Sequence, residues 1–128
     1  MSDLKTVFTT DAPVPAGHYS QAIVHGPTIY IAGQLPIDKD GNKLSTGSIE
    51  EQTKLVLNNI EAILLAAGSD KNHVLQMTLY VVDIKNWGKI NRVYADFFGD
   101  HKPARAVVPV PELNYGLGLE VQVVAAVI

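Results

Sequence analysis

Two segments of the chain repeat apolar residues at the spacing of an amphipathic helix. The first covers residues 48–67, where Ser48 and Glu51 form a capping box and Gly68 supplies a left-handed stop. Its apolar stripe consists of Ile49, Val56, Leu57, Ile60, Ile63, Leu64 and Ala67. The second covers residues 86–98, with Trp87, Ile90, Tyr94 and Phe97 facing inward. The pattern therefore predicts two helices.

Shorter segments rich in β-branched and apolar residues predict strands. They are residues 20–24, 28–32, 74–82, 104–110 and 117–128, with similar character at 6–10 before a Pro-rich turn. The brief Gly26-Pro27 connection predicts a hairpin between the first two. This order of elements is typical of an α+β domain with two helices on one face of a mixed sheet.

The last predicted strand is apolar on both faces. Leu119, Val121, Val123, Ala125 and Val127 point one way, whereas Val124, Ala126 and Ile128 point the other. A strand of this kind is normally buried on both faces. Because two helices cover only one face of a sheet, we expect another copy of the chain to cover the second.

Composition narrows the class of protein. The 128 residues fit one domain, residues 1–128, and 47% apolar with 18% charged residues exclude intrinsic disorder. Ten Lys and Arg against thirteen Asp and Glu give a net charge of −3, so no nucleic-acid partner is expected. The N-terminus lacks a secretory signature, and no apolar run approaches about 20 residues. We expect a cytoplasmic protein that does not bind membranes.

The absence of cysteine excludes disulfides, thiolate nucleophiles and Cys-ligated metal centres. The four histidines, which show no metal-ligand spacing, are His18, His25, His73 and His101. We expect them to be loop or surface residues, with no metal site. No P-loop, GxGxxG or Ser-His-Asp signature is present.

Three charged residues interrupt the apolar end of the chain: Arg105, Glu112 and Glu120. Charges in such surroundings are costly unless they are paired or hydrogen-bonded. Arg105 and Glu120 could form a structural ion pair, or Arg105 could hold a ligand carboxylate by two parallel hydrogen bonds. If the last two strands formed a hairpin, these residues would lie near one another, but a slip of one residue would separate them.

Two further positions could contact a ligand. Tyr19 follows a flexible loop, where its hydroxyl could bind a ligand or its ring could fill the edge of the core. Gly33 ends a predicted strand, where a glycine permits either close backbone approach to a ligand or a plain turn. These alternatives remain open from the residues alone.

Several of these segments together resemble the RidA/YjgF family of reactive enamine and imine deaminases. They are Ala12-Pro13, residues 17–22, residues 32–36, residues 103–105 and Glu120, in order along nearly the whole chain. The resemblance implies a chorismate-mutase-like fold with a mixed six-stranded sheet. It also implies a homotrimer with ligand clefts between subunits.

The resemblance further implies hydrolysis of 2-iminopropanoate, 2-iminobutanoate and related enamines to 2-keto acids and ammonia, with no cofactor. On the matching positions, Arg105 looks like the arginine that holds the substrate carboxylate. Glu120 looks like the acid that positions or activates the attacking water. Tyr19 and Asn91 look like cleft-lining residues, and Gly33 looks like a place where backbone meets substrate.

This chain departs from the usual family pattern at several positions. Ala32 replaces a frequent serine, His18 a frequent proline and Val107 a common cysteine, and Lys102 lies in a short 99–102 loop where an aromatic residue is frequent. These departures leave the reaction class standing and bear on substrate choice and rate.

Two other functions fit the same resemblance. A regulatory trimer that binds keto acids without turnover would keep Arg105 but need no acid, so Glu120 favours an enzyme. An RNA-cleaving translation inhibitor is disfavoured by the acidic net charge.

Overall fold

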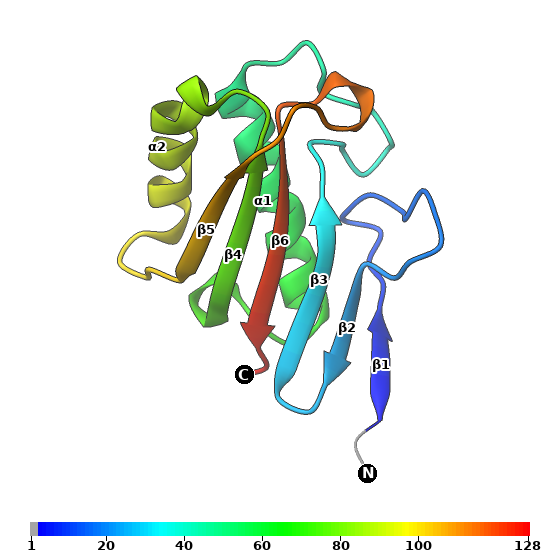
Figure 1. Cartoon of the computed structure of the whole chain (residues 1–128). Coiled ribbons are helices and arrows are strands. Elements are labelled where there is room, and N and C mark those ends of the chain that lie inside the picture. Colours follow the sequence, from blue (N-terminus) through cyan, green and yellow to red (C-terminus); the bar gives the residue numbers. More distant parts are fainter. Residues whose placement is uncertain (1–2) are drawn as a thin grey trace.

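The computed structural model describes residues 3–128, which form one mixed six-stranded sheet in the order β1-β2-β3-β6-β4-β5 (Figure 1). The strands are β1 (Leu4–Val7), β2 (Ala22–His25), β3 (Thr28–Gln34), β4 (Val74–Val81), β5 (Ala104–Pro109) and β6 (Leu119–Ala126). The helices are α1 (Ile49–Ala66) and α2 (Trp87–Phe98), with short 3₁₀ turns η1 (Lys71–His73), η2 (Ile84–Asn86) and η3 (Asn114–Gly116). Both helices pack on one face of the sheet, which confirms the predicted α+β architecture.

Helix α1 begins and ends as its sequence predicts. The Ser48 hydroxyl accepts a hydrogen bond from the Glu51 amide at 3.1 Å, and the Glu51 carboxylate accepts one from the Ser48 amide at 3.0 Å. After the helix, Gly68 adopts a φ of +81°, and the Ser69 amide donates to the Leu64 carbonyl at 2.9 Å. These bonds satisfy backbone groups that a helix leaves free at its ends.

Helix α2 begins one residue later than predicted, after the 3₁₀ turn η2. Ile90 and Tyr94 enter the core as expected, and Phe98 joins them. Trp87 and Phe97 are only half-buried, which leaves their rings available at the helix surface.

A hairpin between β5 and β6 is not formed. Strand β4 lies between them, pairing in parallel with β5 and antiparallel with β6. The reason is that α2 carries the chain from β4 to a parallel neighbour, and the segment through η3 then returns it across β4 to pair with β3. Residues 105 and 120 are therefore not cross-strand neighbours.

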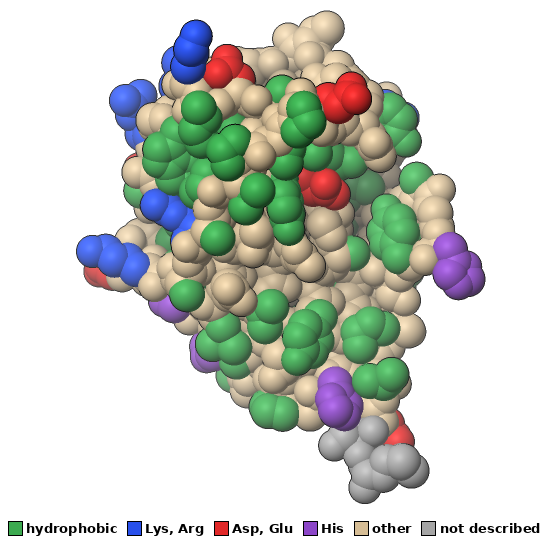
Figure 2. Space-filling model, in the orientation of Figure 1, with side chains coloured by type: hydrophobic (Ala, Val, Ile, Leu, Met, Phe, Trp, Pro, Cys, Tyr) green, Lys and Arg blue, Asp and Glu red, His purple; other side chains and the backbone are tan. Residues whose placement is uncertain are grey.

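The two faces of β6 differ in burial. Leu119, Val121, Val123 and Ala125 lie in the core beneath the helices, each at most 1% exposed. On the other face Val124 and Ala126 are half-buried, and the neighbouring Tyr30 is 51% exposed. Figure 2 shows hydrophobic side chains spread over this helix-free face. That another copy of the chain covers the helix-free face of the sheet stays a prediction.

Within residues 3–128, no helix combines the length and the apolar character that crossing a bilayer requires.

Two glycine substitutions test these local explanations. Gly68→Ala should lower the free energy of unfolding by about 1 kcal/mol, because a Cβ disfavours the left-handed backbone. Gly88→Ala should raise it by about 0.5 kcal/mol, because Gly88 lies in α2 and an added Cβ meets nothing within 4 Å. Urea unfolding at a fixed protein concentration measures both. Shifts in the same direction would contradict the explanation.

Candidate functional site

A β-bulge in β3 brings Gly33 against Glu120. Ile31 pairs with Val123 and Gln34 with Val121, so β3 contains one residue more than β6 between these pairs. An ideal Cβ on Gly33 would lie 2.6 Å from Glu120 Oε2 and 3.1 Å from its Cδ. The carboxyl of Glu120 thus occupies the space that any side chain at position 33 would fill. Bulges often lie next to functional sites for this reason, since they redirect neighbouring groups.

The environment of Glu120 disfavours its charge. Its side chain is half-buried, and burial raises the pKa of the carboxyl above its ordinary value. No ion pair or hydrogen bond within residues 3–128 compensates the carboxylate. A carboxylate with a raised pKa is a better proton acceptor near neutral pH than an ordinary one.

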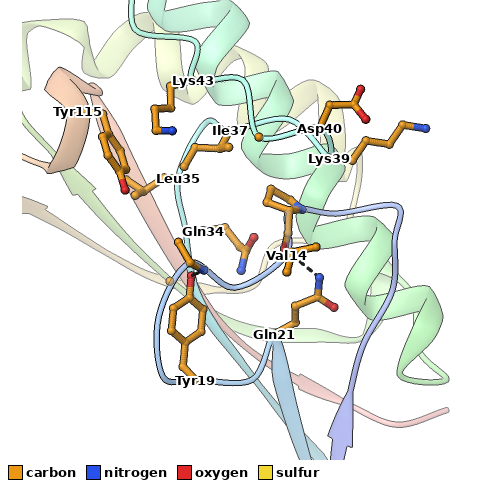
Figure 3. A pocket seen from close by; sticks show the side chains of 14 residues that line it. Val14, Tyr19, Gln21, Gln34, Leu35, Ile37, Lys39, Asp40, Lys43 and Tyr115 are labelled. Carbon is orange, nitrogen blue, oxygen red and sulfur yellow. Dashed lines mark hydrogen bonds between the residues drawn. The ribbon is translucent and has the colours of Figure 1, made fainter.

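Tyr19 and Gly33 line one cavity of about 240 Å³ (Figure 3). The cavity lies between the loop that precedes β2 and the loop that follows β3. Tyr19 is 52% exposed, and its hydroxyl accepts a hydrogen bond from the Ala16 amide at 3.4 Å. The buried amide of Gln21 ties down the first loop by donating to the Thr9 and Pro13 carbonyls. Tyr19 therefore borders a small cavity and does not fill the core.

Arg105 lies on β5 and reaches onto α2. Its Nη1 donates to Asn91 Oδ1 at 2.8 Å. The guanidinium carbon lies 4.7 Å from the Trp87 ring centre and 4.9 Å from that of Tyr94, within the range of cation–π attraction. In residues 3–128 no carboxylate forms an ion pair with it. Arg105 is thus oriented by three residues of one helix and remains exposed.

The hydroxyl of Tyr94 is an unpaired polar group. Tyr94 is 6% exposed, and its oxygen has no hydrogen-bond partner within residues 3–128. Burial raises the pKa of this phenol, and the Arg105 guanidinium opposes the rise both through its charge and through its position beside the hydroxyl. An unsatisfied buried hydroxyl is destabilising.

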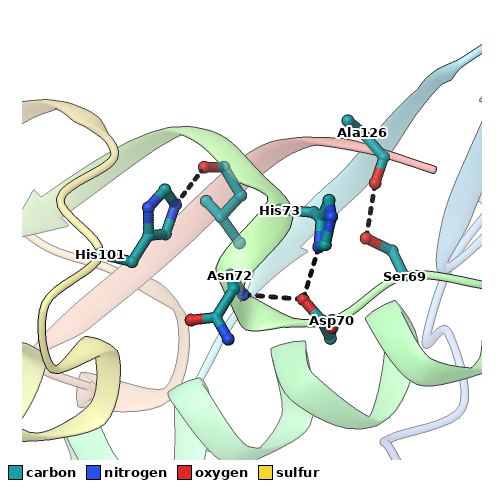
Figure 4. Close-up of polar contacts among 7 residues, drawn as sticks. Ser69, Asp70, Asn72, His73, His101 and Ala126 are labelled. Carbon is teal, nitrogen blue, oxygen red and sulfur yellow. Dashed lines mark hydrogen bonds and ion pairs between the residues drawn. The ribbon is translucent and has the colours of Figure 1, made fainter. Parts of the chain in front are cut away.

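The short loop before Arg105 is held by a histidine. His101 Nε2 contacts the Val74 carbonyl at 2.7 Å, where the chain enters β4 (Figure 4). Lys102 of this loop lines a second cavity of about 440 Å³ together with Asn91 and Arg105. The loop therefore sets where β5, and with it Arg105, begins.

The other histidines occupy the positions expected of loop or surface residues. His73 Nδ1 lies 2.7 Å from Asp70 Oδ1, and this hydrogen bond lowers the pKa of Asp70 (Figure 4). The remaining two are exposed. Among the described residues no three His, Asp or Glu side chains are grouped to hold a metal ion.

Arg105 and Glu120 do not meet within one chain. Arg105 pairs with Met77, which faces the helices, whereas Glu120 pairs with Tyr80 on the helix-free face. Their backbones are about 14 Å apart, two strand spacings across and three residues along the sheet. The interpretation as a structural Arg105–Glu120 ion pair is therefore wrong. The structure joins Arg105 with Asn91, and Glu120 with Gly33, as two separate groups.

The comparisons with known proteins agree with this fold. The family model for Endoribonuclease L-PSP matches residues 9–127. A RutC family protein of Pyrococcus horikoshii is 45% identical over 121 residues, 94% of this chain and 96% of that protein. A mouse protein named 2-iminobutanoate/2-iminopropanoate deaminase is 38% identical over 121 residues, 94% of this chain and 90% of that protein. The crystal structure of yeast Mmf1 matches with a TM-score of 0.95 at 35% identity, covering 98% of this chain and all of that one.

The chain is a small α+β protein, with two helices on one face of a single mixed sheet. The solved structure of yeast Mmf1 has the same fold over almost the whole length of the chain. The chain belongs to the endoribonuclease L-PSP family, which is the RidA/YjgF family.

Tyr94→Phe tests whether the Tyr94 hydroxyl is unpaired. Removing the hydroxyl should raise the free energy of unfolding by about 1 kcal/mol, because no hydrogen bond is lost. Tyr80→Phe is the matched control, since the Tyr80 hydroxyl donates to Gln122 Oε1 at 3.2 Å. Urea unfolding of both variants measures the difference. A loss of stability in Tyr94→Phe would show that the hydroxyl has a partner in the assembled protein.

Glu120→Gln tests the raised pKa of Glu120. The folded chain binds this proton more tightly than the unfolded chain, so ionisation above the folded pKa lowers stability. The glutamine variant should match the wild type at pH below about 4 and exceed it in melting temperature at neutral pH. Glu112→Gln, at an exposed glutamate, controls for the loss of one charge. A melting-temperature gap that closes as pH rises would contradict the prediction.

Proposed function

We propose that this protein hydrolyses short 2-imino acids, such as 2-iminopropanoate and 2-iminobutanoate, to 2-keto acids and ammonia. The observation that carries the proposal is the pair of uncompensated charges, an oriented Arg105 and a carboxyl of raised pKa at Glu120. The half-buried Glu120 charge costs stability unless a ligand or a reaction uses it, and Arg105 is oriented with no carboxylate partner in the described chain. The mouse relative's name supports the substrate class.

Arg105 would bind the substrate carboxylate. Asn91 occupies one N–H of its guanidinium, and the stacked rings of Trp87 and Tyr94 fix its plane. A planar guanidinium with further N–H groups free can donate two parallel hydrogen bonds to a carboxylate. The α-carboxylate of an imino acid provides that partner.

Glu120 would act on the water. Water adds to the carbon of the protonated imine while Glu120 accepts one of its protons, which forms a carbinolamine. Glu120 returns this proton to the carbinolamine nitrogen, the C–N bond breaks to release ammonia, and the hydroxyl loses its proton as the carbonyl forms. A positioned carboxylate of this kind contributes about 10²–10⁴-fold to such a step. Because Gly33 has no side chain, the substrate can approach the carboxyl over bare backbone. Tyr19 would border the same cleft.

The two groups would come from different copies of the chain. Since Arg105 and Glu120 lie on opposite faces of one sheet, one chain cannot place both against a small imino acid. A homotrimer with clefts between subunits would bring Arg105 and Asn91 of one copy to Tyr19, Gly33 and Glu120 of the next. The apolar helix-free face supports such an assembly, because soluble monomers rarely expose large apolar patches.

The decisive measurement is the decay of 2-iminobutanoate generated in situ, with and without the protein. Arg105→Ala should abolish acceleration, and Arg105→Lys should lose most of it, because an ammonium lacks the planar fork. Glu120→Gln should lose turnover while binding of 2-oxobutanoate, measured by calorimetry, persists. Binding without any turnover in the wild type would instead indicate a regulatory keto-acid-binding protein.

Mixed assemblies test the shared site. Arg105→Ala and Glu120→Gln chains, each inactive alone, should recover activity when they are co-refolded in equal amounts. In a closed three-fold assembly about one quarter of the sites then contain both intact residues. Light scattering should give three times the chain mass of 13.8 kDa. A mixture that stays inactive, or a fully active monomer, would contradict the shared site.

A further inference from the structure

The cavity lined by Tyr19 and Gly33 carries an ammonium group that the proposed reaction does not use. Lys43 and Tyr115 lie on the same side of this cavity, facing Leu35 (Figure 3). We propose that Lys43, held by Tyr115, is a second anion-binding position, which suits this site to 2-imino acids and 2-keto acids with a second carboxylate. The inference rests on the proposed function and names a substrate class for it.

Tyr115 holds a backbone conformation that a tyrosine rarely adopts. Its φ is +63°, the only positive φ among the non-glycine residues of the described chain, and Gly116 follows with +68°. The Tyr115 carbonyl accepts a hydrogen bond from the Ser45 hydroxyl at 3.0 Å, across 70 residues of sequence. Strained residues held in place by their surroundings tend to lie at ligand-binding sites. Here the strain places the Tyr115 ring on the cavity wall.

The ring of Tyr115 in turn positions Lys43. The Lys43 Nζ lies 4.6 Å from the ring centre, close enough for cation–π attraction. The backbone of Lys43 is fixed as well, since it forms a β-bridge with Ile37. Between them, Asp38 accepts hydrogen bonds from the amides of Asp40 and Asn42 and closes the turn. An ammonium on a tied loop and over a fixed ring loses little freedom when it binds an anion.

The other charged residues of the cavity are placed differently. Lys39 and Asp40 also line it, but their side chains extend from the opposite rim, away from Tyr115 (Figure 3). The side between Tyr19 and Tyr115 therefore has Lys43 as its charged group among the lining residues. A carboxylate on that side would contact one cation and two aromatic rings.

The cavity joins the Lys43 side to the reacting end. Gly33 is one of the residues that line the cavity, and an ideal Cβ on Gly33 would lie 2.6 Å from Glu120 Oε2. The volume of about 240 Å³ equals that of about eight water molecules, enough for the far end of a short dicarboxylic acid. A substrate held near Glu120 can thus extend toward Lys43.

Binding of two 2-keto acids to the whole protein tests the position without relying on turnover. Calorimetry compares 2-oxoglutarate, which has a second carboxylate, with 2-oxobutanoate, which does not. Lys43→Met should weaken 2-oxoglutarate binding about fivefold and leave 2-oxobutanoate binding unchanged, as expected for one exposed charge pair. Lys43→Arg should retain the preference, and Tyr115→Phe, which keeps the ring, should do so as well. Lys39→Met is the matched control from the opposite rim and should change neither ligand.

Two results would overturn the inference: equal effects of Lys43→Met on both keto acids, or equal effects of Lys43→Met and Lys39→Met on 2-oxoglutarate. In turnover, Lys43→Met should lower kcat/KM for the imine of aspartate and leave that for 2-iminobutanoate unchanged, whereas Lys39→Met should change neither. A Lys43-dependent preference in binding with no turnover of either imine would support the subsite and refute the proposed reaction. Turnover of both imines with no dependence on Lys43 would support the proposed reaction and refute the subsite.

Discussion

Strand β6 is hydrogen-bonded along both edges, and its alternation of side chains constrains the rest of the molecule. One set of residues builds the core under α1 and α2, and the other set lies on the helix-free face. Glu120 belongs to the second set. Its backbone position is fixed because β6 is hydrogen-bonded to β3 along one edge and to β4 along the other. The β3 bulge at residues 32–33 then supplies the space for its carboxyl. Core packing and the candidate site therefore depend on the same register.

This arrangement separates two groups that the proposed reaction needs together. Arg105 is on an edge strand and faces α2, whereas Glu120 is on an inner strand and faces away from the helices. Each side chain is held without a partner of opposite charge in the described chain. For the half-buried Glu120 carboxyl this lowers the stability of an isolated subunit. Assembly could bring both groups to one ligand and cover the apolar face in one step. Activity would then report on assembly.

Local sequence signals were sufficient to predict most helices and strands, but they did not predict which strands lie side by side in the sheet. The Ser48–Glu51 capping box, Gly68 and the Gly26-Pro27 turn are short-range features, and each has the predicted structure. The order of β5, β4 and β6 is a long-range property, because a strand pattern does not encode which strand lies beside it. The ion-pair interpretation for Arg105 failed on that order.

The candidate site shows the same division. The sequence predicted Gly33 at the end of a strand, as a turn or a close approach to a ligand, whereas β3 continues to Gln34 and contains a bulge there. The sequence did not reveal that the Glu120 carboxyl fills the vacant Cβ position. One face of α2 carries Trp87, Asn91 and Tyr94 at spacings of four and three residues. This spacing is typical of a core-facing helix, and only the structure shows that Arg105 packs against it. The sequence did not single out Tyr115 as a site residue. Its distinguishing feature is a positive φ, a backbone conformation that tyrosine rarely adopts.

The chain is acidic as a whole, yet lysines line two of its cavities. The chain carries a net charge of −3, which repels polyanions such as nucleic acids at long range. Yet Lys102 lines the cavity beside Arg105, and Lys43 lines the cavity beside Gly33. These exposed lysines attract small anions over short distances, because screening limits the reach of the surrounding acidic residues. Lys102 and Lys43 thus place positive charge beside Arg105 and Gly33 in a chain that is acidic as a whole.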